Sequence, residues 1–191
     1  MNSYQRPLTK LRVSLLDACN FGCVYCMPPS AAFLKKEDYL SADEIIRIVG
    51  NLVEYGVEEV RLTGGEPTLR SDLPVIVDKL GKLFLKKISI TTNASRLLQF
   101  LPALAEGPCR SINISLDSLE PSNFKKITNN DGLGRVLDAI EHARALGFKI
   151  KINMVVMKGL NHHEIINFVR FAEREQIEVR FLEVMNIGVV R

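Results

Sequence analysis

Tryptophan is absent from this chain of 191 residues, aromatic residues make up only 7% of it, and neither sign of charge dominates. The 25 Lys and Arg against 22 Asp and Glu leave a formal net charge of +3, which gives no reason to expect nucleic acid or a membrane surface as partner. With 12 Gly and 8 Pro, the chain is neither linker-dominated nor collagen-like. Its 47% hydrophobic content instead predicts one globular domain over residues 1–191.

Long apolar runs are also lacking. None approaches the roughly 20 residues that span a bilayer, and residues 1–7 contain no apolar core of a signal peptide. We therefore expect a cytoplasmic protein. Cysteine is scarce too, but three of the four cysteines lie within eight residues, and a reducing compartment disfavours disulfides. That clustering indicates a metal site.

Short runs rich in Val, Ile and Leu alternate with amphipathic segments along the chain. The predicted strands are 11–16, 58–63, 87–92, 111–116, 149–157 and 178–184. Five helices are predicted: one from a capping box of Ser41 and Glu44 to Gly56, one capped by Ser71 or Asp72 and ending at Leu80, and three over 97–105, 133–146 and 162–174. Such βα steps imply parallel strands with right-handed crossovers, in an open sheet or a partial barrel.

Cations inside four of the predicted strands help to decide between these architectures. They are Arg12, Arg61, Lys151 and Arg180. A cation between the sheet and its covering helices would be desolvated without a partner, so these side chains should face a polar cavity on the other side. The alternative is that some lie at strand ends in solvent. We predict an α/β fold with a partial (β/α)6 TIM-like barrel, a wet lumen, and the active site at the carboxyl ends of the strands.

The strongest chemical signal is a Cys-x3-Cys-x2-Cys pattern formed by Cys19, Cys23 and Cys26 just after the first strand. Three thiolates at this spacing can ligate three corners of a [4Fe-4S] cluster and leave one iron open. Structural zinc usually needs four ligands, and Cys109 and the three histidines lie far along the chain. Zinc or chance clustering is the alternative.

This cysteine pattern resembles that of the radical S-adenosylmethionine (SAM) enzymes, and Tyr25 resembles the aromatic residue that packs against adenine in that family. A second match is Leu-Thr-Gly-Gly-Glu-Pro at 62–67, which resembles the family's segment that receives the methionine amino group. Gly64 and Gly65 would allow close backbone approach, and Glu66 could neutralise an ammonium group. Taken alone, this segment could be a simple turn.

More specific similarity runs over nearly the whole chain to the GTP 3′,8-cyclase family of lyases, the first enzymes of molybdenum cofactor biosynthesis. The matching segments are 11–14, 19–28, 61–70, 91–93, 113–118, 151–153 and 180–185. The resemblance implies SAM contacts from Tyr25, Gly64, Gly65, Glu66, Ser115 and Met185. It implies GTP contacts from Arg12, Arg61, Thr91, Lys151, Asn153 and Arg180.

The same resemblance implies the chemistry. A reduced cluster cleaves SAM to methionine and a 5′-deoxyadenosyl radical, which begins the cyclisation of GTP, while the protein orients and shields the reactants. An electron donor protein such as flavodoxin or ferredoxin is implied as partner. Full-length family members continue into a C-terminal region with a second three-cysteine cluster, which this sequence lacks, so a separate C-terminal fragment is a further expected partner.

Smaller departures from the family are Ala18 and Gly22 in place of arginine and Ala94 in place of glycine. The competing hypotheses are a radical SAM enzyme with another substrate, a non-catalytic core that binds cluster and SAM, and a metal-binding structural module. His162, His163 and Glu164 resemble a metal tract, but their position after Asn161 fits a solvated helix start. Cys109 is expected to be an ordinary buried thiol.

Overall fold

The computed structural model describes residues 7–26 and 32–185. It contains one six-stranded sheet with the strand order β1-β2-β3-β4-β5-β6. The strands are β1 (Lys10–Ser14), β2 (Glu59–Thr63), β3 (Lys87–Thr92), β4 (Ser111–Ser115), β5 (Lys149–Val156) and β6 (Glu178–Glu183). Each strand pairs in parallel with the next one in the sequence, as predicted, so every connection crosses from one end of the sheet to the other.

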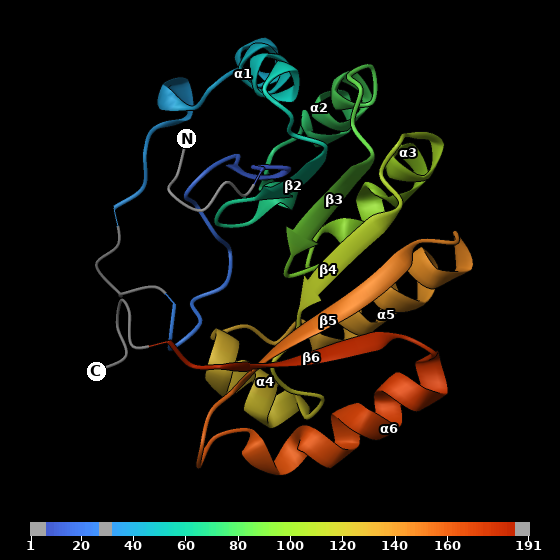
Figure 1. The fold of residues 1–191 in the computed structure, drawn as a ribbon. Coiled ribbons are helices and arrows are strands. Elements are labelled where there is room, and N and C mark those ends of the chain that lie inside the picture. Colours follow the sequence, from blue (N-terminus) through green and yellow to red (C-terminus); the bar gives the residue numbers. More distant parts are fainter. Residues whose placement is uncertain (1–6, 27–31, 186–191) are drawn as a thin grey trace.

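Helices fill these connections on one side of the sheet (Figure 1). The α-helices are α1 (Ala42–Glu54), α2 (Leu73–Leu80), α3 (Leu101–Glu106), α4 (Pro121–Thr128), α5 (Leu133–Ala145) and α6 (Ile165–Glu175). Short 3₁₀ turns are η1 (Lys36–Asp38), η2 (Pro67–Leu69), η3 (Leu97–Gln99) and η4 (His162–Glu164). This is the α/β partial barrel that the sequence predicts.

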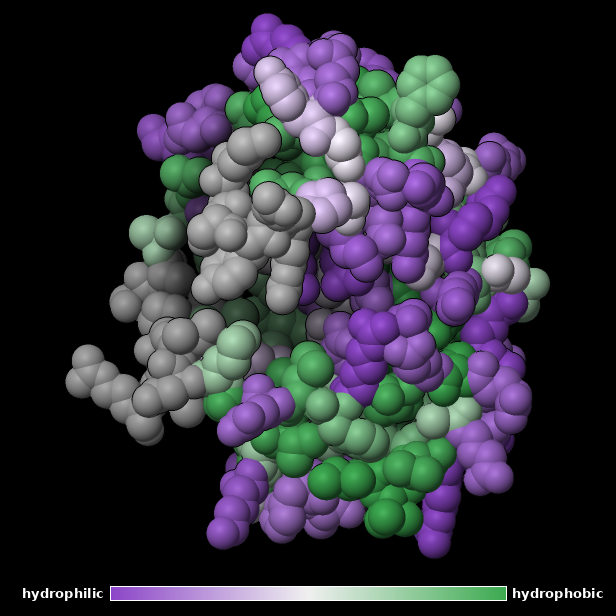
Figure 2. Space-filling view, in the orientation of Figure 1, coloured by the Kyte–Doolittle hydropathy of each residue, from purple (hydrophilic) through white to green (hydrophobic). Residues whose placement is uncertain are grey.

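The two faces of the sheet differ in polarity. Side chains toward the helices are apolar and fully buried, including Leu62, Ile90, Ile112 and Ile152, each 0% exposed. The register places polar side chains on the other face, where Arg12 lies beside Arg61 and Asn153 beside Arg180. Figure 2 shows hydrophilic side chains gathered over the middle of the molecule. The strand cations therefore do face a polar lumen.

Local signals in the sequence account for most helix boundaries. At α1, Glu44 N donates to Ser41 Oγ at 3.3 Å and Ser41 N donates to Glu44 Oε2 at 2.8 Å, which confirms the capping box. The predicted side-chain cap of α2 is wrong, because Asp72 stands at the N-cap but binds the Arg70 guanidinium instead. That ion pair draws the carboxylate away from the helix N-terminus.

Two helical predictions need correction, and one helix was missed. The predicted helix 97–105 is divided into η3 and α3, with Pro102 in the first turn of α3. The predicted helix 162–174 begins as the 3₁₀ turn η4 and becomes α6 only at Ile165. The helix α4 was not predicted, because its eight residues offer a short apolar stripe centred on Phe124 and Ile127.

In the part of the chain that the structure describes, the helices are too short or too polar to cross a bilayer.

Candidate radical SAM active site

The three cysteines lie on the loop that follows β1, at the end to which the strand arrows point (Figure 1). Gly22 N donates to Thr128 O at 2.9 Å, and Val24 N donates to Ile127 O at 3.0 Å. These carbonyls belong to the last turn of α4, where helix oxygens lack partners within the helix. The unpredicted helix α4 thus supports the cysteine loop. Met27 and Pro28 of the matching segment lie outside the described residues.

The glycine segment after β2 packs directly on the same loop. Gly65 N donates to Leu16 O at 2.8 Å and Glu66 N donates to Ala18 O at 2.9 Å. A Cβ at Gly65 would overlap the Ala18 carbonyl, and Gly64 has a φ of 141°, which L side chains rarely adopt. Both glycines are therefore required by the approach of two backbone segments. Their contact with SAM stays a prediction.

The Glu66 carboxylate is buried and accepts four hydrogen bonds from the protein. Its Oε1 accepts from Thr68 N at 2.9 Å, Thr68 Oγ1 at 2.6 Å and Thr92 Oγ1 at 2.5 Å, and its Oε2 accepts from Asn93 N at 2.6 Å. Because each carboxylate oxygen carries two lone pairs, three donors on Oε1 and one on Oε2 leave Oε2 with capacity for a further donor. Glu66 therefore joins the loop after β2 to the loop after β3, a role that its sequence motif did not reveal.

Asn93 extends this network to the first cysteine. Its Nδ2 donates to Cys19 Sγ at 3.7 Å and to Asn20 Oδ1 at 3.1 Å. Hydrogen bonds to a cysteine sulfur favour its charged form, as a metal-bound thiolate requires. The side chain is only 8% exposed, so its position is fixed by packing as well.

One cavity of about 300 Å³ collects most of the predicted cofactor residues. Its lining includes Cys19, Cys23, Cys26, Tyr25, Gly64, Gly65, Glu66, Thr91 and Ser115. Burial raises the pKa of Cys19, and burial followed by the nearby Asp117 carboxylate raises the pKa of Cys23 to about 12. Without a cation these thiols stay protonated, whereas bound iron would deprotonate them.

The cysteine sulfurs do not form a compact group of three in this structure. Among the described residues, the group of three potential ligands whose atoms all lie within 4.8 Å of one another is Glu120, His163 and Glu164. It contains none of the cysteines. Ligands of one zinc ion must crowd around one point, whereas the three cysteines of a cubane bind separate corners. The donor set therefore fits a [4Fe-4S] cluster held by Cys19, Cys23 and Cys26.

A second, more apolar groove of about 470 Å³ adjoins the cysteine cavity, and both share Tyr25, Cys26 and Val155. Its other lining residues are Leu182, Glu183, Val184 and Met185. The structure thus brings Met185 near Tyr25, although the two are far apart in sequence. Tyr25 Oη donates to Asp117 Oδ2 at 2.7 Å, and burial raises the pKa of Asp117 to about 6.

Of the predicted substrate residues, Thr91 lines the cysteine cavity, and the others lie deeper in the lumen. Arg12 and Arg61 line a hollow of about 340 Å³ that also includes Lys10, Glu59 and Ser89. Burial, and then repulsion from Arg12 and Arg180, lower the pKa of Arg61. Within the described part of the chain, the buried Nε of Arg61 has no hydrogen-bond acceptor. A guanidinium stays charged under these conditions and attracts an anion.

The remaining predicted cations are partly neutralised by a residue that sequence reasoning missed. Glu178 binds Lys151 at 2.5 Å and Arg180 at 2.6 Å, and these partners lower its pKa. The register pairs Glu178 with Lys151, so the strands themselves create this contact. Asn153 lies on the same face next to Arg180. These three predicted residues share the lumen without lining the cysteine cavity.

Comparison with known proteins now decides the family. Residues 13–172 match the model of the Radical SAM superfamily. The chain belongs to this superfamily. Membership implies a [4Fe-4S] cluster and SAM as cofactors, and the cysteine cavity described above is the place that fits them.

Curated relatives of this radical SAM chain include the GTP 3′,8-cyclase of Synechocystis sp., 48% identical over 188 residues, which cover 98% of this chain and 58% of the relative. Another is the molybdenum cofactor biosynthesis protein moc-5 of Caenorhabditis elegans, 43% identical over 97% of this chain and 31% of the relative. The chain thus spans little more than half of the first relative and about a third of the second. Streptococcus suis SuiB bound to S-adenosylmethionine shares the fold, with a TM-score of 0.82 at 22% identity over 94% of this chain and 41% of SuiB.

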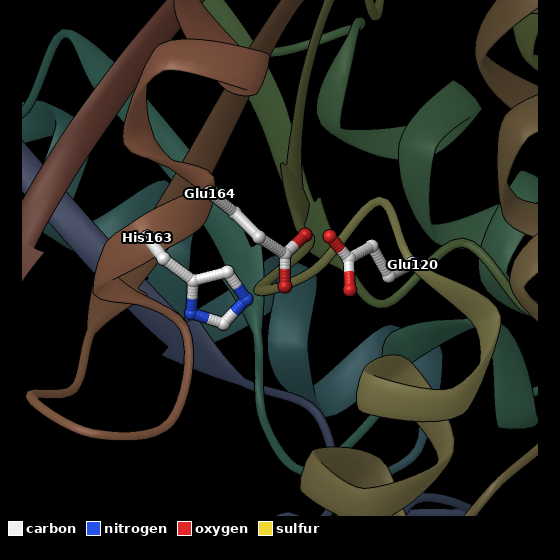
Figure 3. Close-up of side chains that lie close together, drawn as sticks. All are labelled: Glu120, His163 and Glu164. Atoms are coloured by element: carbon white, nitrogen blue, oxygen red, sulfur yellow. The ribbon is translucent and has the colours of Figure 1, made fainter.

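Outside this site, Glu120, His163 and Glu164 face one another with potential ligand atoms within 4.8 Å (Figure 3). His162 and His163 are exposed, which confirms the predicted solvated helix start for both, but the same prediction is wrong for Glu164. Glu164 is buried and accepts hydrogen bonds from Ser118 Oγ, Leu119 N and Asn123 Nδ2 at 2.6 to 2.7 Å. Its carboxylate therefore anchors the loop after β4 to η4. Cys109 is 0% exposed, as expected of an ordinary buried thiol.

Proposed function

We propose that this chain forms the radical SAM core of a GTP 3′,8-cyclase and acts in molybdenum cofactor biosynthesis. Support comes from relatives with that name that align with almost the whole chain, such as the one from Synechocystis sp. at 48% identity. Reductive cleavage of SAM to a 5′-deoxyadenosyl radical is the chemistry that the bound cofactors supply. The residues of the chain hold the cofactors and orient the substrate.

The observation that carries the substrate assignment is the excess of positive charge in the lumen. Arg12 and Arg61 lie beside each other, and the buried Arg61 Nε has no acceptor within the described residues. A triphosphate supplies several anionic oxygens, which guanidinium groups bind with paired hydrogen bonds. Lys151, Asn153, Arg180 and Thr91 complete the proposed GTP site on the same face.

On the cofactor side, we assign the SAM contacts to Tyr25, Gly64, Gly65, Ser115 and Met185 around the cysteine cavity and its apolar neighbour. Glu66 lines the same cavity, and because three of its four protein donors engage Oε1, we assign the contact with the SAM amino group to Oε2. A protein electron donor such as flavodoxin or ferredoxin supplies the electron. A cytoplasmic setting would keep the three cysteines reduced.

In this proposal, the guanine base of GTP is bound by a second polypeptide. Radical chemistry needs the reacting hydrogen to be held close to the deoxyadenosyl carbon, and the lumen residues named above recognise phosphate charge. We propose that a polypeptide carrying a second three-cysteine cluster holds the base. The greater length of the curated relatives is consistent with such an addition.

The test measures nucleotide binding to the anaerobically reconstituted chain by equilibrium dialysis. GTP, ATP and inorganic tripolyphosphate should bind with similar affinity, and Arg61→Met should weaken all three about tenfold or more, since it removes a charge-assisted contact. Lys125→Ala is the matched control, because that cation is exposed on α4. In parallel, dithionite should release 5′-deoxyadenosine from SAM, and changing Cys19, Cys23 and Cys26 to Ala should abolish this release.

Two results would contradict the proposal. Absence of triphosphate binding, with 5′-deoxyadenosine still formed, would favour a radical SAM enzyme with another substrate. Absence of 5′-deoxyadenosine above a dithionite-only background would favour a non-catalytic core.

A further inference from the structure

A buried carboxylate next to the cysteine cavity fixes the ring of Tyr25. Tyr25 Oη donates to Asp117 Oδ2 at 2.7 Å, and Val155 N donates to Asp117 Oδ1 at 2.8 Å. Asp117 follows β4 and is 3% exposed. One carboxylate therefore joins three segments: the cysteine loop, the carboxyl end of β4, and β5. Because each oxygen serves a different segment, the carboxylate cannot turn without losing one of these hydrogen bonds.

The backbone around this carboxylate is fixed as well. Asn161 Nδ2 donates to Asp117 O and to Val155 O, both at 2.8 Å, and Asn161 Oδ1 accepts from Met157 N at 2.7 Å. Asn161 is 0% exposed. Satisfied buried polar networks of this kind make a site rigid. The position of Asp117 is therefore set by the fold, before any ligand binds.

The fixed position of Asp117 also affects the part of Tyr25 that lines the two cavities. Tyr25 lines both the cysteine cavity and the apolar groove. Val155, Leu182 and Met185 line the same groove. With its hydroxyl engaged by Asp117, the ring offers the groove an apolar surface whose orientation is fixed. A flat aromatic group packs well against such a surface, and its affinity depends on the orientation of the ring.

We propose that Asp117 is a positioning residue that holds the Tyr25 ring where it receives the adenine of SAM. This inference rests on the proposed function, because it takes the apolar groove as the adenosyl half of the SAM site. Asp117 should then control affinity for ligands that contain adenosine, and it should leave the methionine half of the site unaffected.

The experiment compares dissociation constants of three probes for the anaerobically reconstituted chain: SAM, 5′-deoxyadenosine and methionine. Asp117→Ala should weaken SAM and 5′-deoxyadenosine about tenfold, as expected for one lost hydrogen bond to a charged group. Methionine affinity and the iron and sulfide content should stay unchanged. Tyr25→Phe should weaken the same two probes, and the double variant should lose no more than Asp117→Ala alone, since the residues act as one unit.

Two further variants separate positioning from folding. Asp117→Asn keeps an acceptor for Val155 N and can still pair with the Tyr25 hydroxyl, so it should restore most of the affinity lost in Asp117→Ala. Ser118 is adjacent to Asp117, and its Oγ donates a buried hydrogen bond to Glu164 at 2.7 Å. Ser118→Ala removes this hydrogen bond and leaves the contact of Asp117 with Tyr25 in place, so it should change none of the three affinities.

The proposal is overturned if Asp117→Ala leaves the affinity for 5′-deoxyadenosine unchanged. It is also overturned if methionine and 5′-deoxyadenosine weaken equally, which would indicate a general structural role. Failure of the unmodified chain to bind SAM at all is a different result, because it contradicts the proposed function and removes this inference with it.

Discussion

The mouth of the barrel is the cysteine cavity with the loops around it at the carboxyl ends of the strands. The mouth and the lumen are both polar, but they satisfy their polar groups in opposite ways. At the mouth, the buried carboxylates of Glu66 and Asp117 accept four and two hydrogen bonds, all from neutral groups of the protein. In the lumen, Arg12 and Arg61 lie side by side, and the Arg61 Nε lacks an acceptor within the described residues. The carboxylates at the mouth thus find their partners within the protein, whereas the cations of the lumen are placed to attract an anion.

This difference separates two kinds of substitution. A change at the mouth leaves buried donors without partners, which costs stability in the ligand-free chain. A change in the lumen removes mutual repulsion between cations, so it costs binding and spares stability. The free energy of unfolding of the metal-free chain, measured by urea denaturation, tests this separation.

The largest effect is expected at Gly65, where the backbone of the cysteine loop lies closest to the glycine segment. Gly65→Ala should lower the free energy of unfolding by about 3 kcal/mol, because a Cβ would overlap the Ala18 carbonyl and force the two backbone segments apart. The control is Gly134→Ala in α5, where nothing lies within 4 Å of the added Cβ and the change should stabilise the helix by up to about 1 kcal/mol. Equal effects at both positions would contradict the close approach.

A smaller loss is expected for Glu66→Gln. The amide can keep the three donors that contact Oε1, but its NH₂ group would then face Asn93 N, which donates to Oε2. One buried donor without a partner costs about 1–3 kcal/mol. Glu54→Gln, at an exposed position of α1, should have no measurable effect. A Glu66→Gln chain as stable as the original would show that the mouth does not depend on this carboxylate.

In the lumen, the sign should reverse. Arg61→Met keeps an apolar stem and removes the charge that Arg12 and Arg180 repel, so the free energy of unfolding should stay equal or rise by about 1 kcal/mol. The same variant should lose triphosphate binding, as proposed above. A destabilisation comparable to that of Glu66→Gln would mean that the Arg61 cation supports the fold, and the contrast between mouth and lumen would fail.

The smallest effect concerns Ala94, which follows Asn93 at the mouth. Its φ of 60° is a left-handed conformation that favours glycine. Ala94→Gly should therefore raise the free energy of unfolding by about 0.5 kcal/mol, after part of the gain is offset by the loss of a buried methyl group. Ala139→Gly, inside α5, should lower it by about 1 kcal/mol or more. A loss of similar size at both positions would contradict the assigned strain.

Sequence patterns predicted the sheet well because its signals are local. Runs of Ile and Val mark the strands, and the three cysteines lie within one loop, so neither requires knowledge of distant contacts. The short helix α4 was missed because Phe124 and Ile127 are too few to establish a helical period. Asp117 was missed as a partner of Tyr25 because the two are 92 positions apart, and Asn161, 44 positions from Asp117, was missed for the same reason.

The order in which the chain is made has a consequence for loading the cluster. Among the described residues, the cysteine loop precedes the partners named above: Glu66 and Asn93 follow it, then Asp117 and Thr128, and last Val155, which holds Asp117. At about 5–20 residues per second, a ribosome needs roughly 10 s to proceed from the last of the three cysteines to Val155. During that interval the thiols are synthesised but their site is not built. Under the proposed assignment of the three cysteines, the site that would hold the cluster is complete only after most of the barrel has been translated.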